Sequence, residues 1–255
     1  MRRFIFPLLP PYLSPLFLFS SSKVSYSGNR LLGRVSIIIP CYLLHHKRYL
    51  GAKKKSITAI MSTFAFANSS EKVPGNGTLP AEFIIKASPG TDVWSKPPST
   101  ERFNAPILYQ SVPLNSFKRA RVAFNAFWKD KYDQGGLILV LNSANGPRRW
   151  VKTGIELTHG RPHLSTVTKD RFADWSLQPV PSGGGAATLE IVRESDDSLW
   201  IYLVEGVQKN PLREVTWFFE EQDVQDLWVG LYAAKPSNEG QDLVVNFGHF
   251  IIDTV

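Results

Sequence analysis

Hydrophobic and polar positions alternate in short segments along most of the chain after residue 61. These segments are rich in β-branched and aromatic side chains, and Gly, Pro, Asn, Asp and Ser stand between them. Runs of this kind, about four to eight residues long, are typical of β-strands. We therefore predict strands in EFIIKAS, APILYQSVP, FKRARVAFNAFW, GGLILVLN, RWVKTGIELTH, HLSTVTK, TLEIVRES, SLWIYLVEG, EVTWFFEE, DLWVGLYAA and DLVVNFGHFIID.

Helical periodicity is almost absent from the same region, apart from one turn's length in EEQDVQDLW. Many short strands with turn residues between them are typical of an antiparallel β-sandwich or jelly roll. The clearest hairpin is TLEIVRESDDSLWIYLVEG, with Ser195–Ser198 as its turn. We predict a single all-β sandwich domain over residues 62–255, preceded by an unstructured extension over residues 1–61.

Three predicted strands have one aliphatic face and a second face that mixes aromatic, polar and glycine residues. Successive side chains of a strand point to opposite sides of the sheet. The mixed faces therefore carry Tyr132, Gln134 and Gly136; Trp150, Lys152, Gly154 and Glu156; and Trp228, Gly230 and Tyr232. Such a surface could bind a planar ring stacked on an aromatic side chain, with the glycines clearing space for it. Alternatively, the aromatic residues pack beneath loops that cover the sheet, and the glycines form bulges or bends.

The charge of the chain is divided unevenly at about residue 61. The formal net charge is +7, but residues 1–60 hold 10 of the 29 basic residues and none of the 22 acidic ones. Residues 61–255 consequently have a net charge of −3. The main domain therefore lacks the electrostatic basis for nucleic-acid binding.

Residues 1–61 allow three interpretations. Translation could begin at Met61, where the composition changes; the segment could be a secretory leader; or it could be a transit peptide, since it is basic and free of acidic residues. No apolar run approaches the ~20 residues that a membrane span needs. The single cysteine, Cys41, permits no intrachain disulfide and suits a reducing compartment. We expect a cytoplasmic monomer without a membrane span, or a secreted protein if the leader is genuine.

Residue patterns for catalysis or metal binding are weak. A glycosidase needs two carboxyl groups on either side of the scissile bond, but Glu221 and Asp223 stand in a polar turn segment and Glu156 is alone on its strand. A lyase could be assembled from Tyr132, Gln134, Lys152 and His159, and this alternative stays open. His159 and His163 belong to a turn rather than to one helix face, which argues against zinc. We predict no metal and no cofactor.

Five motifs together resemble a known family: DVWSKPP, YDQGGLILVL, RWVKTGIEL, STVTKDRFADWS and LWVGLYAAKPS. They resemble a domain-of-unknown-function family of concanavalin A-like lectin/glucanase sandwiches. That family includes the fungal regulation-of-enolase protein and relatives encoded with bacterial pectin-degradation genes, and a related sandwich is an accessory domain of some bacterial β-xylosidases. The resemblance extends over residues 82–252. It implies two curved antiparallel sheets, of which the concave one faces carbohydrate.

The resemblance and the mixed strand faces together define candidate ligand-binding residues. They are Tyr132, Asp133, Gln134, Trp150, Lys152, Glu156, Asp174, Trp175 and Tyr232. Trp94 is expected to close one end of the sandwich, with a ligand-lining role as the alternative. We predict non-catalytic recognition of an oligosaccharide on the concave sheet. The alternatives are an intracellular regulatory protein that acts through protein contacts, as in enolase regulation, and a weak glycan-active hydrolase or lyase.

Overall fold

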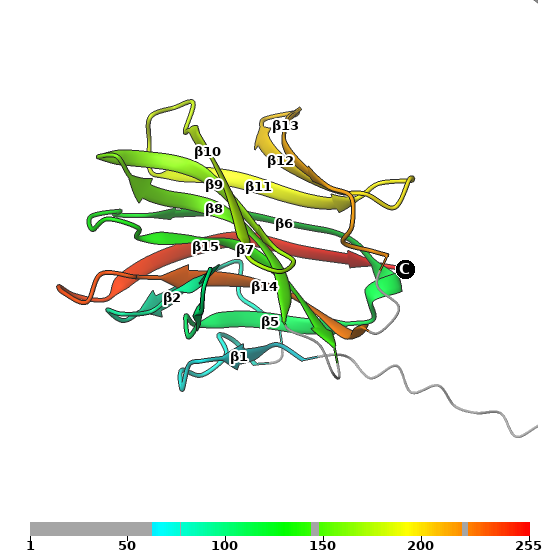
Figure 1. Ribbon diagram of the computed structural model, residues 1–255, viewed down its shortest axis with the longest axis horizontal. Helices are drawn as coiled ribbons and strands as arrows, with labels where there is room; N and C mark the ends of the chain where they lie inside the picture. Colours follow the sequence, from blue (N-terminus) through cyan, green and yellow to red (C-terminus); the bar gives the residue numbers. More distant parts are fainter. Residues whose placement is uncertain (1–62, 77, 144–147, 221–223) are drawn as a thin grey trace, which may run out of the picture. The chain divides into compact units, whose positions relative to one another are not determined.

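Two large antiparallel sheets make up most of the computed structural model (Figure 1). The structure describes residues 63–255 except 77, 144–147 and 221–223, so the predicted extension over residues 1–61 lies outside the described residues. The seven-stranded sheet contains, in spatial order, β1 (Ala65–Ala67), β5 (Ile107–Val112), β14 (Val224–Ala234), β7 (Gln134–Ser143), β8 (Arg149–Thr158), β9 (Arg161–Lys169) and β10 (Ala173–Pro179).

The six-stranded sheet completes the sandwich. Its spatial order is β13 (Gln208–Val215), β12 (Leu199–Glu205), β11 (Ala186–Arg193), β6 (Phe117–Ala126), β15 (Leu243–Thr254) and β2 (Glu82–Ala87). A 3-10 helix, Leu114–Ser116, directly precedes β6, and β3 (Val93–Lys96) and β4 (Thr100–Phe103) form a separate hairpin. No helix in the described part of the chain is long and apolar enough to cross a membrane.

The main hydrophobic core lies between the two sheets. Leu139 of β7 and Val151 and Ile155 of β8 belong to one buried cluster with Leu189 and Ile191 of β11. Val151 and Ile155 are the aliphatic positions that the alternation of this strand placed opposite Trp150 and Lys152. The all-β sandwich predicted from the sequence is therefore confirmed, and so are the two faces of β8.

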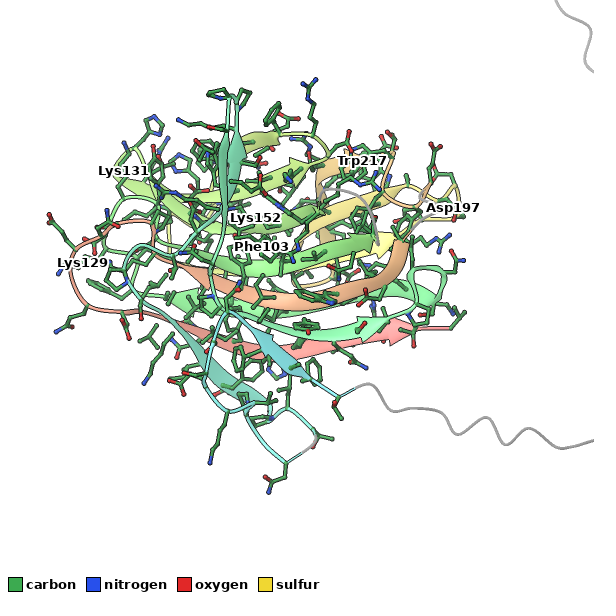
Figure 2. All side chains as sticks on the ribbon, turned by 60° about the horizontal axis from the view of Figure 1, so that its bottom comes forward. Phe103, Lys129, Lys131, Lys152, Asp197 and Trp217 are labelled. Carbon is green, nitrogen blue, oxygen red and sulfur yellow. The ribbon has the colours of Figure 1, made fainter. Side chains whose placement is uncertain are left out.

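A second, smaller core covers the other face of the seven-stranded sheet, which we call the outer face. Ile138, Trp150 and Tyr232 are buried there together with Val93 of the β3–β4 hairpin. Figure 2 labels Phe103 of the hairpin and Lys152 of β8 in this region. The aromatic residues of the mixed strand faces are thus partly covered, as the alternative interpretation of the sequence proposed.

One predicted strand is wrong in its position. The segment EVTWFFEE was expected to be a strand, but β13 ends at Val215 and residues 216–219 form a turn. Phe218 in this turn is fully buried in the main core and packs edge-on against Phe219. A run of three aromatic residues predicts a strand, yet here the rings close one side of the core from a turn.

Candidate functional site

A cavity of about 720 Å³ opens on the outer face of the seven-stranded sheet, beside the β3–β4 hairpin. Its volume falls within the range of about 300–1,000 Å³ that is usual for small-molecule sites. The lining comes from the hairpin, the loop before β7, strands β7, β8 and β10, and the loop after β14. The lining residues are Asp92, Trp94, Lys96, Thr100, Arg102, Asp130, Lys131, Tyr132, Gln134, Lys152, Glu156, Trp175, Pro236 and Ser237.

Strand register brings the polar residues of the cavity floor together. Gln134 of β7 pairs directly with Glu156 of β8, and Lys152 stands four residues before Glu156 on the same face. The Lys152 ammonium donates hydrogen bonds to Gln134 Oε1 and, at 2.7 Å, to the carbonyl oxygen of Val93. Gln134 Nε2 in turn donates to Asp92 Oδ1 at 3.4 Å. One network therefore ties the sheet to the start of the hairpin.

The floor of the cavity holds three buried ionisable groups, the amine of Lys152 and the carboxyl groups of Asp92 and Glu156. Lys152 is 2% exposed and Glu156 is 5% exposed. Burial lowers the pKa of Lys152, and the nearby charges of Glu156 and Asp92 oppose that change. Burial likewise raises the pKa of Glu156 and of Asp92, and the Lys152 charge counteracts both shifts. The Lys152 cation therefore offsets part of the cost of burying the two carboxylates, whereas Asp92 and Glu156 oppose each other's ionisation.

Three aromatic side chains surround the open part of the cavity. Trp175 of β10 meets Trp94 of the hairpin edge to face, with ring centroids 5.8 Å apart, and Tyr132 similarly at 6.2 Å. Trp175 Nε1 donates to Ser165 Oγ at 2.9 Å, and Ser165 Oγ donates to Glu156 Oε2 at 2.8 Å. The indole ring is therefore held in a fixed position and connected to the charged floor. All three rings are half-buried.

The structure places Asp133 beneath the cavity, because it is buried and does not line the space. Its Oδ2 accepts hydrogen bonds from the backbone N–H groups of Lys129 and Asp130, at 3.1 and 2.9 Å. Its Oδ1 lies 3.5 Å from the ammonium of Lys235. Asp133 therefore shapes the turn that presents Tyr132, which itself has a positive φ of 71°.

Three further candidates also lie outside the cavity lining. Trp150 is 0% exposed and Tyr232 is 1% exposed, and both belong to the second core. The Lys152 ammonium lies 5.8 Å from the ring centroid of Trp150 and 5.6 Å from that of Tyr232, so the two rings pack beside Lys152 and support the floor. Asp174 is exposed and forms an ion pair with Arg213 of β13.

The hairpin supplies cavity residues that the sequence analysis did not propose. Asp92, Lys96, Thr100 and Arg102 all line the space, and Trp94 lines it too rather than only closing the sandwich. The motif DVWSKPP marked this segment, but β4 reads TERF and has no hydrophobic alternation. Nothing in the local pattern predicts that the hairpin folds over the sheet.

The histidine pair and the acidic turn can also be placed. His159 and His163 have ring centroids 6.2 Å apart and do not line the cavity. Among the residues that the structure describes, no group of three His, Cys, Asp or Glu side chains could hold a metal ion. Glu221 and Asp223 lie outside the described residues.

The glycines of the mixed faces have a backbone role. Gly136 pairs directly with Gly154 across β7 and β8. A Cβ atom built on Gly154 would lie 2.0 Å from the carbonyl oxygen of Gly135, and one on Gly136 would lie 2.2 Å from that of Thr153. The glycines therefore permit a close approach of the two strands that carry Gln134, Lys152 and Glu156.

Gly154→Ala is expected to lower the free energy of unfolding by about 1–3 kcal/mol, because the added methyl group forces the strands apart. Urea unfolding followed by tryptophan fluorescence measures this loss. Gly160→Ala is the contrasting variant, because no atom of the described residues lies within 4 Å of its Cβ position and its positive φ of 75° is what opposes the change. Full stability of Gly154→Ala would contradict the close approach.

The fold and the cavity define a class of protein: a β-sandwich with a polar, aromatic-lined cavity beneath a hairpin on one sheet. The chain belongs to the protein family of unknown function DUF1349, whose match covers residues 73–254. An uncharacterized protein of Emericella nidulans, AN7484, is 69% identical over 193 residues, which cover 76% of this chain and 96% of that protein.

Solved structures share the sandwich at low sequence identity. A functionally unknown protein from Saccharomyces cerevisiae superimposes with a TM-score of 0.62 at 21% identity, over 76% of this chain and 98% of its own. The Bacteroides ovatus protein described as Xyloglucan PUL GH43B gives a TM-score of 0.51 at 15% identity, over 69% of this chain and 33% of its own. These likenesses concern the fold alone.

Proposed function

We propose that the protein binds a carbohydrate in the cavity beneath the β3–β4 hairpin. The observation that carries this proposal is the fixed, half-exposed ring of Trp175, which lies beside the hydrogen-bonding groups of Gln134 and Glu156. A sugar has an apolar ring face and a rim of hydroxyl groups. It therefore needs one aromatic surface and several donors and acceptors held at its edge.

The carboxyl groups of the cavity favour recognition over hydrolysis. Glu156 accepts a hydrogen bond from Ser165, and Asp92 Oδ1 accepts one at 2.8 Å from the backbone N–H of Val93. A hydrolase needs one carboxyl free to protonate the leaving group and another free to attack or to activate water. Both groups here are engaged in holding the cavity together, and Asp130, the third carboxyl of the lining, is ion-paired with Lys235. Release of reducing sugar by the purified protein would nevertheless reveal catalysis directly.

Trp175→Ala is expected to weaken glycan binding at least tenfold, or by about 1.4 kcal/mol, because the stacking surface is lost. A glycan array with the full chain identifies a ligand, and titration calorimetry then measures its affinity. Trp200→Ala is the matched control: this half-buried tryptophan of β12 stacks on Tyr202 in the six-stranded sheet. Gln134→Ala tests the polar floor in the same way.

Two results would contradict the proposal. Equal affinities of wild type and Trp175→Ala would place the glycan elsewhere. Binding of no glycan would favour the other function implied by the resemblance to the regulation-of-enolase protein, which is regulation through protein contacts. In that case co-purification with enolase, tested with wild type and Trp175→Ala, becomes the informative measurement.

A further inference from the structure

Three exposed cations stand in the lining of the cavity, and we call them the mouth cations. They are Lys96 of β3, Arg102 of β4 and Lys131 of the loop before β7. Within the described part of the chain, none of them forms a salt bridge with a carboxylate, although Lys131 lies 4.8 Å from the ring centroid of Tyr132. Their charges are therefore available to a ligand.

The three carboxylates that line the cavity are outnumbered by its four lining cations, Lys96, Arg102, Lys131 and Lys152. Asp130 is 31% exposed and is ion-paired with the buried Lys235, whose ammonium also approaches Asp133. The Lys235 hydrogen bond lowers the pKa of Asp130 and keeps this carboxyl charged. Asp92 and Glu156 share the buried charge of Lys152. Burial raises the pKa of Asp92, and the charges of Lys152 and Arg102 counteract that shift, so Arg102 also acts on the floor. The lining as a whole keeps a small positive excess, and its exposed cations lie at the mouth.

This positive charge is not a consequence of a generally basic domain. Residues 61–255 have a net charge of −3, so three free cations around one cavity contrast with the rest of the sandwich. The floor is different, because the negative charges of Asp92 and Glu156 would repel an anion that entered deeply. The cavity thus favours a ligand whose negative charge stays at the mouth while a neutral polar part reaches the floor.

We infer that the ligand is an acidic saccharide that carries a carboxylate, as uronic acids do. This inference rests on the proposed function and adds the charge of the ligand. The carboxylate is bound at the mouth by Arg102, whose planar guanidinium can donate two parallel hydrogen bonds, with Lys96 and Lys131 adding attraction. The sugar ring stacks on Trp175, and its uncharged hydroxyl groups reach Gln134.

The test compares uronate trisaccharides with their own methyl esters, which have the same rings and length but no charge. Trigalacturonate and trimannuronate, each as acid and as ester, are titrated against the full chain. At low salt the best acid is expected to bind at least tenfold more tightly than its ester. The difference should shrink as salt is raised, because exposed charges are screened.

A paired set of variants assigns this preference to the mouth. Arg102→Ala combined with Lys131→Ala should lose most of the preference for the acid over the ester, because only Lys96 of the mouth cations remains. Lys86→Ala combined with Lys118→Ala removes two exposed lysines from β2 and β6 of the other sheet and should keep the preference. Thermal unfolding of both double variants verifies that these two proteins are folded.

The outcomes separate the two proposals. Equal affinity of wild type for acid and ester overturns the acidic ligand and leaves carbohydrate binding intact. Loss of the preference in the Lys86 and Lys118 variant would overturn the role of the mouth cations. Binding of neither acids nor esters, together with no signal from neutral glycans on the array, overturns both the acidic ligand and carbohydrate binding.

Discussion

Replacing Lys152 with methionine is expected to lower the free energy of unfolding by about 3–5 kcal/mol at neutral pH, since removing one member of a buried charge group leaves its partners uncompensated. The variant would leave the Val93 carbonyl and Gln134 Oε1 without their donor. Asp92 and Glu156 would lose the cation that offsets their burial. Urea unfolding measures the loss. Lys96→Met, at an exposed position, should change stability by no more than about 0.5 kcal/mol.

The loss in Lys152→Met is expected to depend on pH. Burial raises the pKa of Asp92 and of Glu156, so each binds more protons in the folded than in the unfolded state between its ordinary and its raised pKa. Stability therefore falls as pH rises through that window. Without the charge of Lys152 the pKa values of Asp92 and Glu156 rise further, so the pH window widens. The loss of stability in Lys152→Met is therefore largest at pH values above this window. A loss that stays constant from acid to neutral pH would contradict this account.

Replacing Trp150 with alanine is expected to lower the free energy of unfolding by about 3–5 kcal/mol, the usual cost of truncating a large buried aromatic side chain. Trp150 is fully buried in the second core, beside Lys152 on the same face of β8. The sequence alone suggested a ligand-binding residue, whereas the structure indicates support of the floor. Chemical unfolding measures the stability, and calorimetry measures glycan affinity below the melting temperature.

Trp150→Phe separates packing from direct recognition. Among the described residues Trp150 Nε1 has no hydrogen-bond partner, so phenylalanine removes no polar contact found there and keeps part of the packing. This variant should lose much less stability than Trp150→Ala and should bind glycan with nearly the wild-type affinity. A large loss of affinity with intact stability would show instead that the indole reaches the ligand.

The fold could be predicted because its strands carry clear alternation. On β8, Val151 and Ile155 point into the main core while Trp150 and Lys152 point away from it, as the period of two requires. Elements without alternation were missed, such as β4 with the sequence TERF. The turn containing Phe218 was predicted as a strand, because a run of aromatic residues has a high β-strand propensity whether or not it forms a strand.

The site could be predicted only in part. Tyr132, Gln134, Lys152, Glu156 and Trp175 do meet in one cavity, because neighbouring strands bring one face of β7 and β8 together. Asp133, Trp150, Asp174 and Tyr232 do not line it. Whether a residue on the correct face is covered depends on the β3–β4 hairpin, which lies about 40 residues earlier in the chain. The sequence pattern of a strand does not show whether a distant hairpin covers it.

The β3–β4 hairpin contributes a wall of the cavity without belonging to either large sheet. The inner core of the sandwich does not depend on the residues that line the cavity from this wall. Substitutions at positions such as Lys96 and Arg102 can therefore accumulate during evolution without loss of the scaffold. Relatives with the same sandwich can therefore carry cavities with different linings, and the hairpin is the natural unit to exchange between them.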